Sequence, residues 1–193
     1  MVVVKHYLKL AALLFAQFIV IYGGANWLSG RRDDVHRIYF EWELAIPLVP
    51  PMTWVYFSIA PLMLSPVLFL DINQLNRLAR QMALAMLIAG AVFLVFPGTV
   101  GYPTPADPSK AIEFIRLIDR PYNVLPSLHV ALSSIIVLHL YPLFGTRARL
   151  FLVAWLIALI MSVMLTHQHH LADVLGGLFL ACLCLRLSPD DSR

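Results

Sequence analysis

Long apolar stretches without charged residues alternate with short polar segments along the whole chain. Five of these stretches are long enough for the roughly 20 residues that a membrane-spanning helix needs. A sixth, residues 174–185, becomes long enough if Asp173 lies in the first turn of its helix. The pattern predicts an all-α integral membrane protein, a bundle of six transmembrane helices at about residues 7–28, 52–70, 78–97, 126–143, 149–166 and 169–187.

The composition agrees with this pattern and excludes several other classes of protein. Of the 193 residues, 60% are apolar and 13% are charged, whereas soluble domains are about 45–50% apolar and about 25% charged. Too little polar surface is left for a soluble enzyme, a disordered chain or a disulfide-stabilised scaffold. The net charge of +3 is not gathered in a run of Lys and Arg, so no nucleic-acid partner is expected. We therefore expect a single membrane domain over residues 1–193, surrounded by membrane lipids.

Basic residues and long connections predict the orientation of the bundle. Arg147 and Arg149 lie in a short loop close to two helix ends, where such residues favour the cytoplasmic side. Both termini are then cytoplasmic, and residues 31–51 and 97–121 lie on the outer side. The first of these segments is typical of a short amphipathic piece in the membrane interface. The second is rich in Gly and Pro and is expected to be irregular, either as a solvated loop or as a cap over a site.

A polar cluster that follows the fifth predicted helix contains three histidines and an acid. His169 and Asp173 are four residues apart and share one face at the start of a helix. The carboxylate can accept a hydrogen bond from one ring nitrogen, which leaves the other nitrogen as a base, a nucleophile or a metal ligand. Because His169 and His170 are adjacent, their side chains diverge by about 100° on a helix and can hardly bind one ion. We therefore predict no metal site here.

A second polar cluster, Arg120 to His129, follows the third predicted helix. Pro126 suits the first turn of the next helix, where its missing N–H costs nothing. Ser127, neighbouring backbone N–H groups and the Arg120 guanidinium can together bind an anion such as phosphate, and His129 lies about one turn further on. Because connections after the third and fifth helices face the same side of the membrane, the two clusters are predicted to lie together.

These residues resemble the motifs of the type 2 phosphatidic acid phosphatase superfamily of membrane enzymes. The chain contains Arg120-Pro121, Pro126-Ser127-Leu128-His129 and His169-x-x-x-Asp173, in the order of the family motifs. The form Asn-x-x-Pro-Ser-Leu-His is most similar to the branch that contains inositol phosphorylceramide synthases and related bacterial proteins. Two cations of the family motifs are missing, because their positions fall on Glu113 and Val163.

The resemblance implies a mechanism and a set of site residues within about residues 98–180. His169 would be the nucleophile that forms a phosphohistidine, Asp173 would orient it, and His129 would be the general acid and base. The phosphate would bind Arg120, Ser127 and His167, without a metal or another cofactor.

The expected activity is hydrolysis of a lipid phosphate or pyrophosphate, in a bacterial inner (plasma) membrane with the site on the periplasmic face. Transfer of a phosphoryl or phospho-head group to an alcohol is the first alternative. A small non-enzymatic transporter is the second, and would be expected to show repeated halves or interrupted helices near the bilayer centre. The lipid and the oligomeric state stay open.

Overall fold

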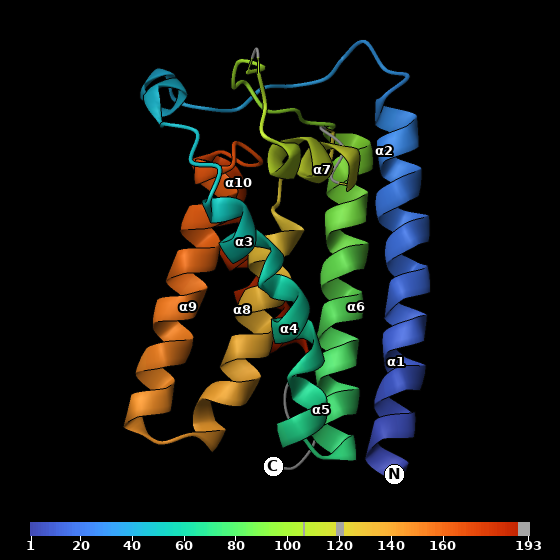
Figure 1. Ribbon diagram of the computed structural model, residues 1–193. Coiled ribbons are helices and arrows are strands. Elements are labelled where there is room, and N and C mark those ends of the chain that lie inside the picture. Colours follow the sequence, from blue (N-terminus) through green and yellow to red (C-terminus); the bar gives the residue numbers. More distant parts are fainter. Residues whose placement is uncertain (106, 119–121, 189–193) are drawn as a thin grey trace.

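Helices that run between the two ends of an elongated bundle make up most of the protein (Figure 1). The computed structural model describes residues 1–105, 107–118 and 122–188. Within these residues there is no β-strand, only an isolated bridge between His36 and Gly98. The helices are α1 (Val2–Phe18), the π-helical η1 (Ile19–Gly23), α2 (Gly24–Ser29), the short 3-10 helix η2 (Glu41–Ala45), α3 (Met52–Phe57), α4 (Ile59–Leu64), α5 (Pro66–Phe69), α6 (Ile72–Val95), α7 (Lys110–Ile118), α8 (Leu128–Leu140), η3 (Tyr141–Leu143), α9 (Thr146–Leu165) and α10 (Leu171–Leu187).

Several of these helices are long and apolar enough to cross a membrane. In the described part of the chain there are four such stretches, Val2–Ser29, Met52–Phe69, Ile72–Val95 and Thr146–Leu165. The helical stretch Leu128–Leu143 is apolar but shorter, and α10 has 17 residues. The described residues therefore confirm an all-helical protein with four candidate membrane-spanning stretches, but not the predicted count of six spans.

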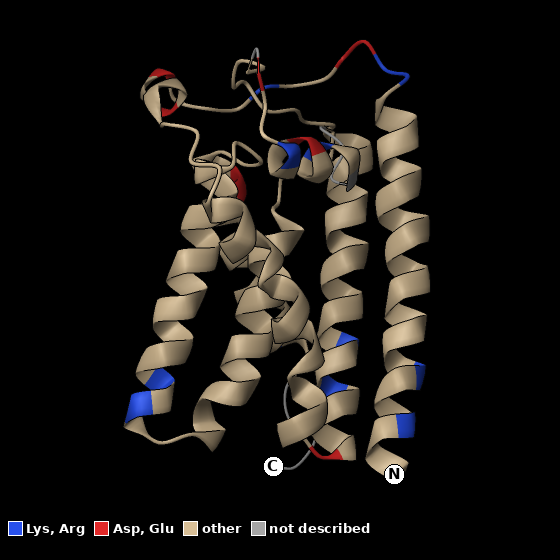
Figure 2. Ribbon diagram, in the orientation of Figure 1, with Lys and Arg blue, Asp and Glu red and all other residues tan. Residues whose placement is uncertain are grey.

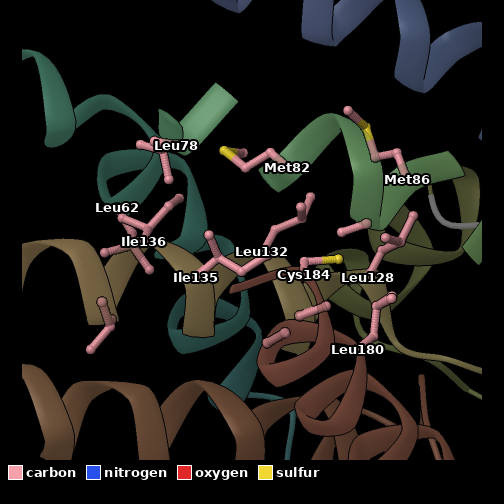
Figure 3. Packing of buried hydrophobic residues seen from close by; sticks show 14 of the residues in the cluster. Leu62, Leu78, Met82, Met86, Leu128, Leu132, Ile135, Ile136, Leu180 and Cys184 are labelled. Carbon is pink, nitrogen blue, oxygen red and sulfur yellow. The ribbon is translucent and has the colours of Figure 1, made fainter. Parts of the chain in front are cut away.

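The centre of the bundle is α8, which packs against α6, α9 and α10. Ile135 and Ile136 of α8 are fully buried and lie among Leu62, Met82 and Leu180 from three other helices (Figure 3). Burial of such side chains stabilises a fold by dispersion contacts as well as by exclusion of water. The rod formed by α1, η1 and α2 lies at the edge of the bundle (Figure 1), with few buried side chains.

The start of α6 lies six residues before the predicted helix boundary. The Asp71 side chain accepts a hydrogen bond from the Gln74 N–H (2.8 Å), and the Gln74 side chain accepts one from the Asp71 N–H (3.0 Å). This reciprocal capping begins the helix at Ile72. Arg77 consequently lies inside the helix, where the sequence pattern had placed a connection.

The helix predicted at residues 52–70 is interrupted, at Ser58 and Ser65. Pro66 has no N–H, so it cannot donate to the carbonyl of Leu62, four residues earlier. The Ser65 hydroxyl donates to that carbonyl instead, at 2.7 Å. An interrupted helix was the feature expected of a transporter, but here the side chains at the break complete the backbone hydrogen bonding.

Lys, Arg, Asp and Glu residues lie towards both ends of the bundle and are absent from the middle of its described helices (Figure 2). The Lys and Arg residues of α1, α6 and α9 lie towards the end that holds the N-terminus. The connections 30–51 and 166–170, and the described residues of 96–127, lie at the other end, which we call the loop end. The predicted meeting of the two polar clusters requires this arrangement.

The described part of the predicted irregular segment contains a helix, α7, which lies across the loop end (Figure 1). Ile112 and Ile115 are fully buried on one of its faces, whereas Phe114 and Leu117 are exposed. Such a two-faced helix suits the membrane interface. Prolines flank this helix on both sides, and it was not predicted.

Candidate active site

A close contact between α8 and α10 brings the two polar clusters together. A Cβ atom on Gly177 would lie 2.5 Å from the Ser127 carbonyl oxygen, so only glycine allows this approach. The Ser127 N–H donates a hydrogen bond to the backbone carbonyl of Asp173 at 3.0 Å. The start of α8 and the start of α10 are therefore held side by side, in agreement with the argument from helix parity.

His169 and Asp173 form a buried pair at the start of α10. Their Nδ1 and Oδ2 atoms are 3.5 Å apart, which is an ion-pair distance but too long for a hydrogen bond. Asp173 Oδ2 instead accepts a hydrogen bond from the His170 N–H at 2.8 Å and caps the helix. The expected orienting contact is thus nearly formed. Hydrogen bonds of this kind are often long in an enzyme without substrate.

His129 is the second residue of α8, with its ring against Tyr56 at a centroid distance of 4.3 Å. Its Nε2 atom is buried and has no hydrogen-bond partner among the described residues. His129 and His169 line the same cavity. The predicted nucleophile, His169, and the predicted general acid, His129, therefore face the same cavity.

That space is an apolar cavity of about 620 Å³ inside the bundle. Its walls come from α1, the α3–α5 stretch, α6 and α8, and no described Asp, Glu, Lys or Arg lines it. A cavity of this size and character suits a long apolar ligand.

A second, polar cavity of about 330 Å³ is also lined by His169. Arg37, Arg116, His167 and Gln168 line it, together with two threonines. The two cavities share Tyr22, Asn123 and His169. His169 therefore stands where an apolar space meets a cationic one.

The predicted phosphate ligands have different places in the structure. Arg120 and Pro121 lie outside the described residues. The Ser127 hydroxyl accepts a weak hydrogen bond from the Val130 N–H (3.4 Å) as the cap of α8, which begins two residues after Pro126. Ser127 is not among the described residues that line either cavity.

His167 lines the polar cavity and has an unusual backbone conformation, with φ of 58°. Its Nε2–H donates to the Ile46 carbonyl at 2.9 Å, since a carbonyl can only accept. Burial lowers the pKa of His167 below that of a free histidine, and the hydrogen bond to Ile46 partly opposes this. The ring is therefore mostly neutral near pH 7, and the buried Nδ1 carries the lone pair.

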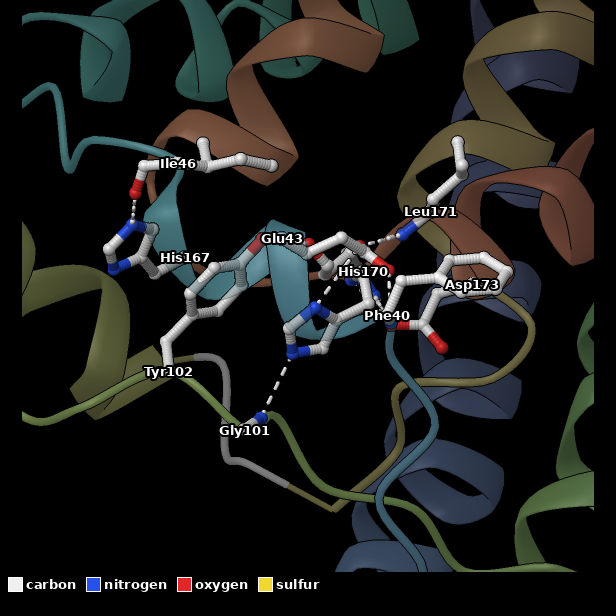
Figure 4. A network of polar contacts seen from close by, with 10 residues as sticks. Phe40, Glu43, Ile46, Gly101, Tyr102, His167, His170, Leu171 and Asp173 are labelled. Atoms are coloured by element: carbon white, nitrogen blue, oxygen red, sulfur yellow. Dashed lines mark hydrogen bonds and ion pairs between the residues drawn. The ribbon is translucent and has the colours of Figure 1, made fainter.

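The sequence analysis did not single out Glu43, which is fully buried beside the turn that carries His169 (Figure 4). Glu43 Oε2 accepts hydrogen bonds from the Leu171 N–H (2.7 Å) and from His170 Nδ1 (3.2 Å), and Oε1 accepts one from the Phe40 N–H (2.8 Å). The Gly101 N–H donates to His170 Nε2 at 2.9 Å, which fixes the proton of the neutral ring on Nδ1. The one available signal was an acidic residue among aromatic ones, directly before a long apolar stretch.

The His170 ring that contacts this carboxylate belongs to a stack of four rings. Tyr39 stacks on His170, His170 on Tyr102, and Tyr102 on His167, with centroid distances of 4.9, 4.2 and 4.0 Å. A side chain on Gly101 would overlap the Tyr39 ring, which explains the glycine. The stack joins three connections of the loop end and fixes the turn that holds His169.

Within the described residues, no three His, Cys, Asp or Glu side chains are grouped in a way that could hold a metal ion. His169 and His170 point to different partners, Asp173 and Glu43.

Comparison with protein families agrees with this geometry. A family model described as the PAP2 superfamily matches residues 36–187, most of the chain, and the protein belongs to that superfamily. Its members are typically phosphatases or related phosphotransfer enzymes. No curated protein and no solved structure matches the chain. The placement in the inositol phosphorylceramide synthase-like branch stays a prediction.

Proposed function

We propose that the protein is a membrane-bound lipid phosphatase that works through a phosphohistidine on His169. The position of His169 between an apolar and a cationic cavity carries this proposal. A lipid phosphate has the same two parts, an apolar tail and an anionic head, joined at the bond to be broken. The tail would occupy the apolar cavity, and the phosphate would lie beside His169.

The reaction has two steps. In the first, His169 Nε2 attacks phosphorus, the bond from phosphorus to the lipid oxygen breaks, and His129 gives its proton to the leaving oxygen. In the second, His129 takes a proton from water, the water oxygen attacks phosphorus, and the bond to His169 breaks to release inorganic phosphate. Asp173 keeps the proton of His169 on Nδ1, so that Nε2 has the lone pair.

Positive charge and hydrogen-bond donors must stabilise the phosphoryl oxygens in both steps. Arg120, Ser127 and His167 are proposed for this role from the family motifs, and His167 lines the polar cavity. We propose that these side chains act without a metal ion. Chelation by EDTA should then leave the activity unchanged, and orthovanadate, which adopts the five-coordinate geometry of the transition state, should inhibit it.

Transfer to an alcohol is a second candidate, favoured by the character of the polar cavity. Thr99, Thr104 and Gln168 add hydroxyl and amide groups to its cationic wall, and these groups suit the hydroxyls of a head-group alcohol. Water at about 55 M competes with any alcohol that is not held in place. Hydrolysis is therefore the first proposal.

We further propose that both termini are cytoplasmic and that the loop end faces the periplasm of a bacterial inner membrane. The Lys and Arg residues of α1, α6 and α9 lie towards the N-terminal end (Figure 2), and the pair Arg147 and Arg149 close to the helix ends there supports this orientation.

Phosphate release from a panel of lipid phosphates tests the proposal directly. Detergent-purified protein would be given phosphatidic acid, phosphatidylglycerol phosphate, sphingosine 1-phosphate and undecaprenyl pyrophosphate. We expect release from at least one of them, together with an acid-labile phosphoenzyme that is absent from His169→Ala. Turnover without a phosphoenzyme in rapid-quench experiments would reject the histidine mechanism, and restoration of EDTA-treated protein by zinc would reject metal independence.

A further inference from the structure

The described structure leaves the positions of two family cations without positive charge. Glu113, in place of the family lysine, is exposed on α7 and carries the opposite charge. Val163, in place of the family arginine, is fully buried in α9. Phosphoryl transfer nevertheless requires fixed donors aimed at the oxygens that do not react.

The polar cavity beside His169 contains two cations that lie outside the family motifs. Arg37 comes from the connection after α2, and Arg116 comes from the last turn of α7. Among the described residues that line this cavity there is no Asp or Glu. Its wall is therefore positively charged close to the proposed nucleophile.

Neither arginine is occupied by another group of the described structure. Within residues 1–105, 107–118 and 122–188, Arg37 and Arg116 have no ion-pair or hydrogen-bond partner. Neighbouring arginines differ in this respect. Arg32 binds the carboxylate of Asp34 at 2.5 Å, and Arg31 lies 3.7 Å above the Trp27 ring. The two cavity guanidinium groups remain available for a ligand.

We infer that Arg37 and Arg116 bind the non-reacting oxygens of the phosphoryl group, in place of the two missing family cations. A guanidinium presents a planar fork of donors that matches two phosphate oxygens. This inference rests on the proposed function, because it assigns the partner of the transferred group. His129 lines the apolar cavity but not the polar one, in the described part of the chain. The alcohol therefore leaves on the apolar side, while the phosphoryl group is held on the side of the arginines.

Charge-removing variants with matched controls test this assignment. Arg37→Gln and Arg116→Gln remove the two cations, and Arg31→Gln and Lys110→Gln remove neighbouring charges from the same connection and from the same helix. We expect each cavity variant to lower kcat/KM for the best lipid phosphate about tenfold, and to raise the vanadate inhibition constant to a similar extent. The controls should stay within about twofold of the wild type. Arg37→Lys and Arg116→Lys should recover only part of the loss, because lysine lacks the fork.

A second measurement separates binding from folding and from turnover. Vanadate should raise the melting temperature of the wild type, and this stabilisation should shrink in the cavity variants but not in the controls. If the cavity variants match the controls while His169→Ala is inactive, the inference is wrong and the proposed function stands. If the wild type hydrolyses none of the lipid phosphates, the proposed function is wrong. A stabilisation by vanadate that depends on Arg37 and Arg116 would then still identify the cavity as an anion site.

Discussion

Glu43 and His170 are 127 residues apart in the sequence, yet Glu43 Oε2 lies 3.2 Å from His170 Nδ1 in the interior of the loop end. The same carboxylate accepts the N–H of Leu171, the first residue of α10. One side chain from the connection between α2 and α3 thus holds the turn that carries the proposed nucleophile.

Replacement of Glu43 by Ala should destabilise this turn. It leaves three donors, on Phe40, His170 and Leu171, without their acceptor, and each unsatisfied buried group costs about 1–3 kcal/mol. We expect a melting temperature lower by about 5 °C or more. Glu41→Ala, in the same short helix but exposed, is the matched control. Equal melting temperatures for the two variants would show that the carboxylate contributes no stability.

His169→Ala and Asp173→Asn should lose activity while the protein stays folded. We expect a loss of at least about a thousandfold for His169→Ala and about a hundredfold for Asp173→Asn, because members of a catalytic unit act together. The Asp173→Asn variant retains a side-chain oxygen that can accept the His170 N–H, so the cap of α10 survives. Phosphate release and size-exclusion profiles would be measured alongside His6→Ala, whose histidine bonds Asn76 in the N-terminal half of the bundle. Substantial turnover by His169→Ala would rule out its role as nucleophile.

Stability should fall as the pH is lowered below about 6.5. Burial lowers the pKa of His167 and of His170 in the folded protein, although Glu43 partly opposes this for His170. The unfolded chain, with ordinary histidine pKa values near 6.5, binds more protons than the folded one in this range, which favours unfolding. Melting temperatures at pH 8 and pH 5 would show the effect, and His167→Gln should reduce the difference. An unchanged pH dependence in this variant would exclude His167 as a contributor.

A large side chain in the apolar cavity should impair long substrates selectively. Leu14 lies on α1 and lines this cavity, and Leu14→Trp would fill part of it. We expect a several-fold lower kcat/KM for a long-chain lipid phosphate and little change for p-nitrophenyl phosphate, which has no tail. Leu13→Trp, one position along on the exposed side of α1, serves as the control. An equal effect on both substrates would argue against tail binding in this cavity.

Cysteine labelling should place the N-terminal end of the bundle in the cytoplasm. With Cys182 and Cys184 replaced by Ala, Thr146→Cys would report on the start of α9, and Asp33→Cys on the loop end. An impermeant maleimide should label the cysteine at position 33 in intact cells, and the one at position 146 only after permeabilisation. The reverse pattern would invert the proposed topology.

The positions of the helices could largely be read from the chain, since uninterrupted apolar length is itself the requirement for a spanning helix. The predicted start of α6 was wrong for a physical reason. A helix does not end where charge appears if a capping group lies further out, and Asp71 caps this helix beyond both Arg77 and Arg80. The interruptions at Ser58 and Ser65 likewise depend on local details of hydrogen bonding within an apolar stretch. At Ser65, the following proline removes a backbone donor and the serine hydroxyl replaces it.

The candidate site was predictable where neighbouring residues carry the chemistry. His169 and Asp173 share a face because of their spacing. His129 could be placed beside them because connections after the third and fifth helices face the same side of the membrane. Arg37 and Glu43 had no such local signal. They reach the site only because residues 31–51 fold over the turn between α9 and α10, and no periodicity in the sequence encodes that contact.

The rod formed by α1, η1 and α2 ends at Ser29, before the family match begins at residue 36. Leu10, Leu14 and Phe18 of this rod nevertheless form a wall of the apolar cavity. In the proposed enzyme, part of the selectivity for the lipid is therefore encoded outside the stretch that carries the chemistry of its phosphate. Substitutions in the first helix can retune which chain lengths are accepted without touching a group that handles phosphorus. An enzyme whose first helix is exchanged would have an altered range of lipid substrates and an unaltered reaction.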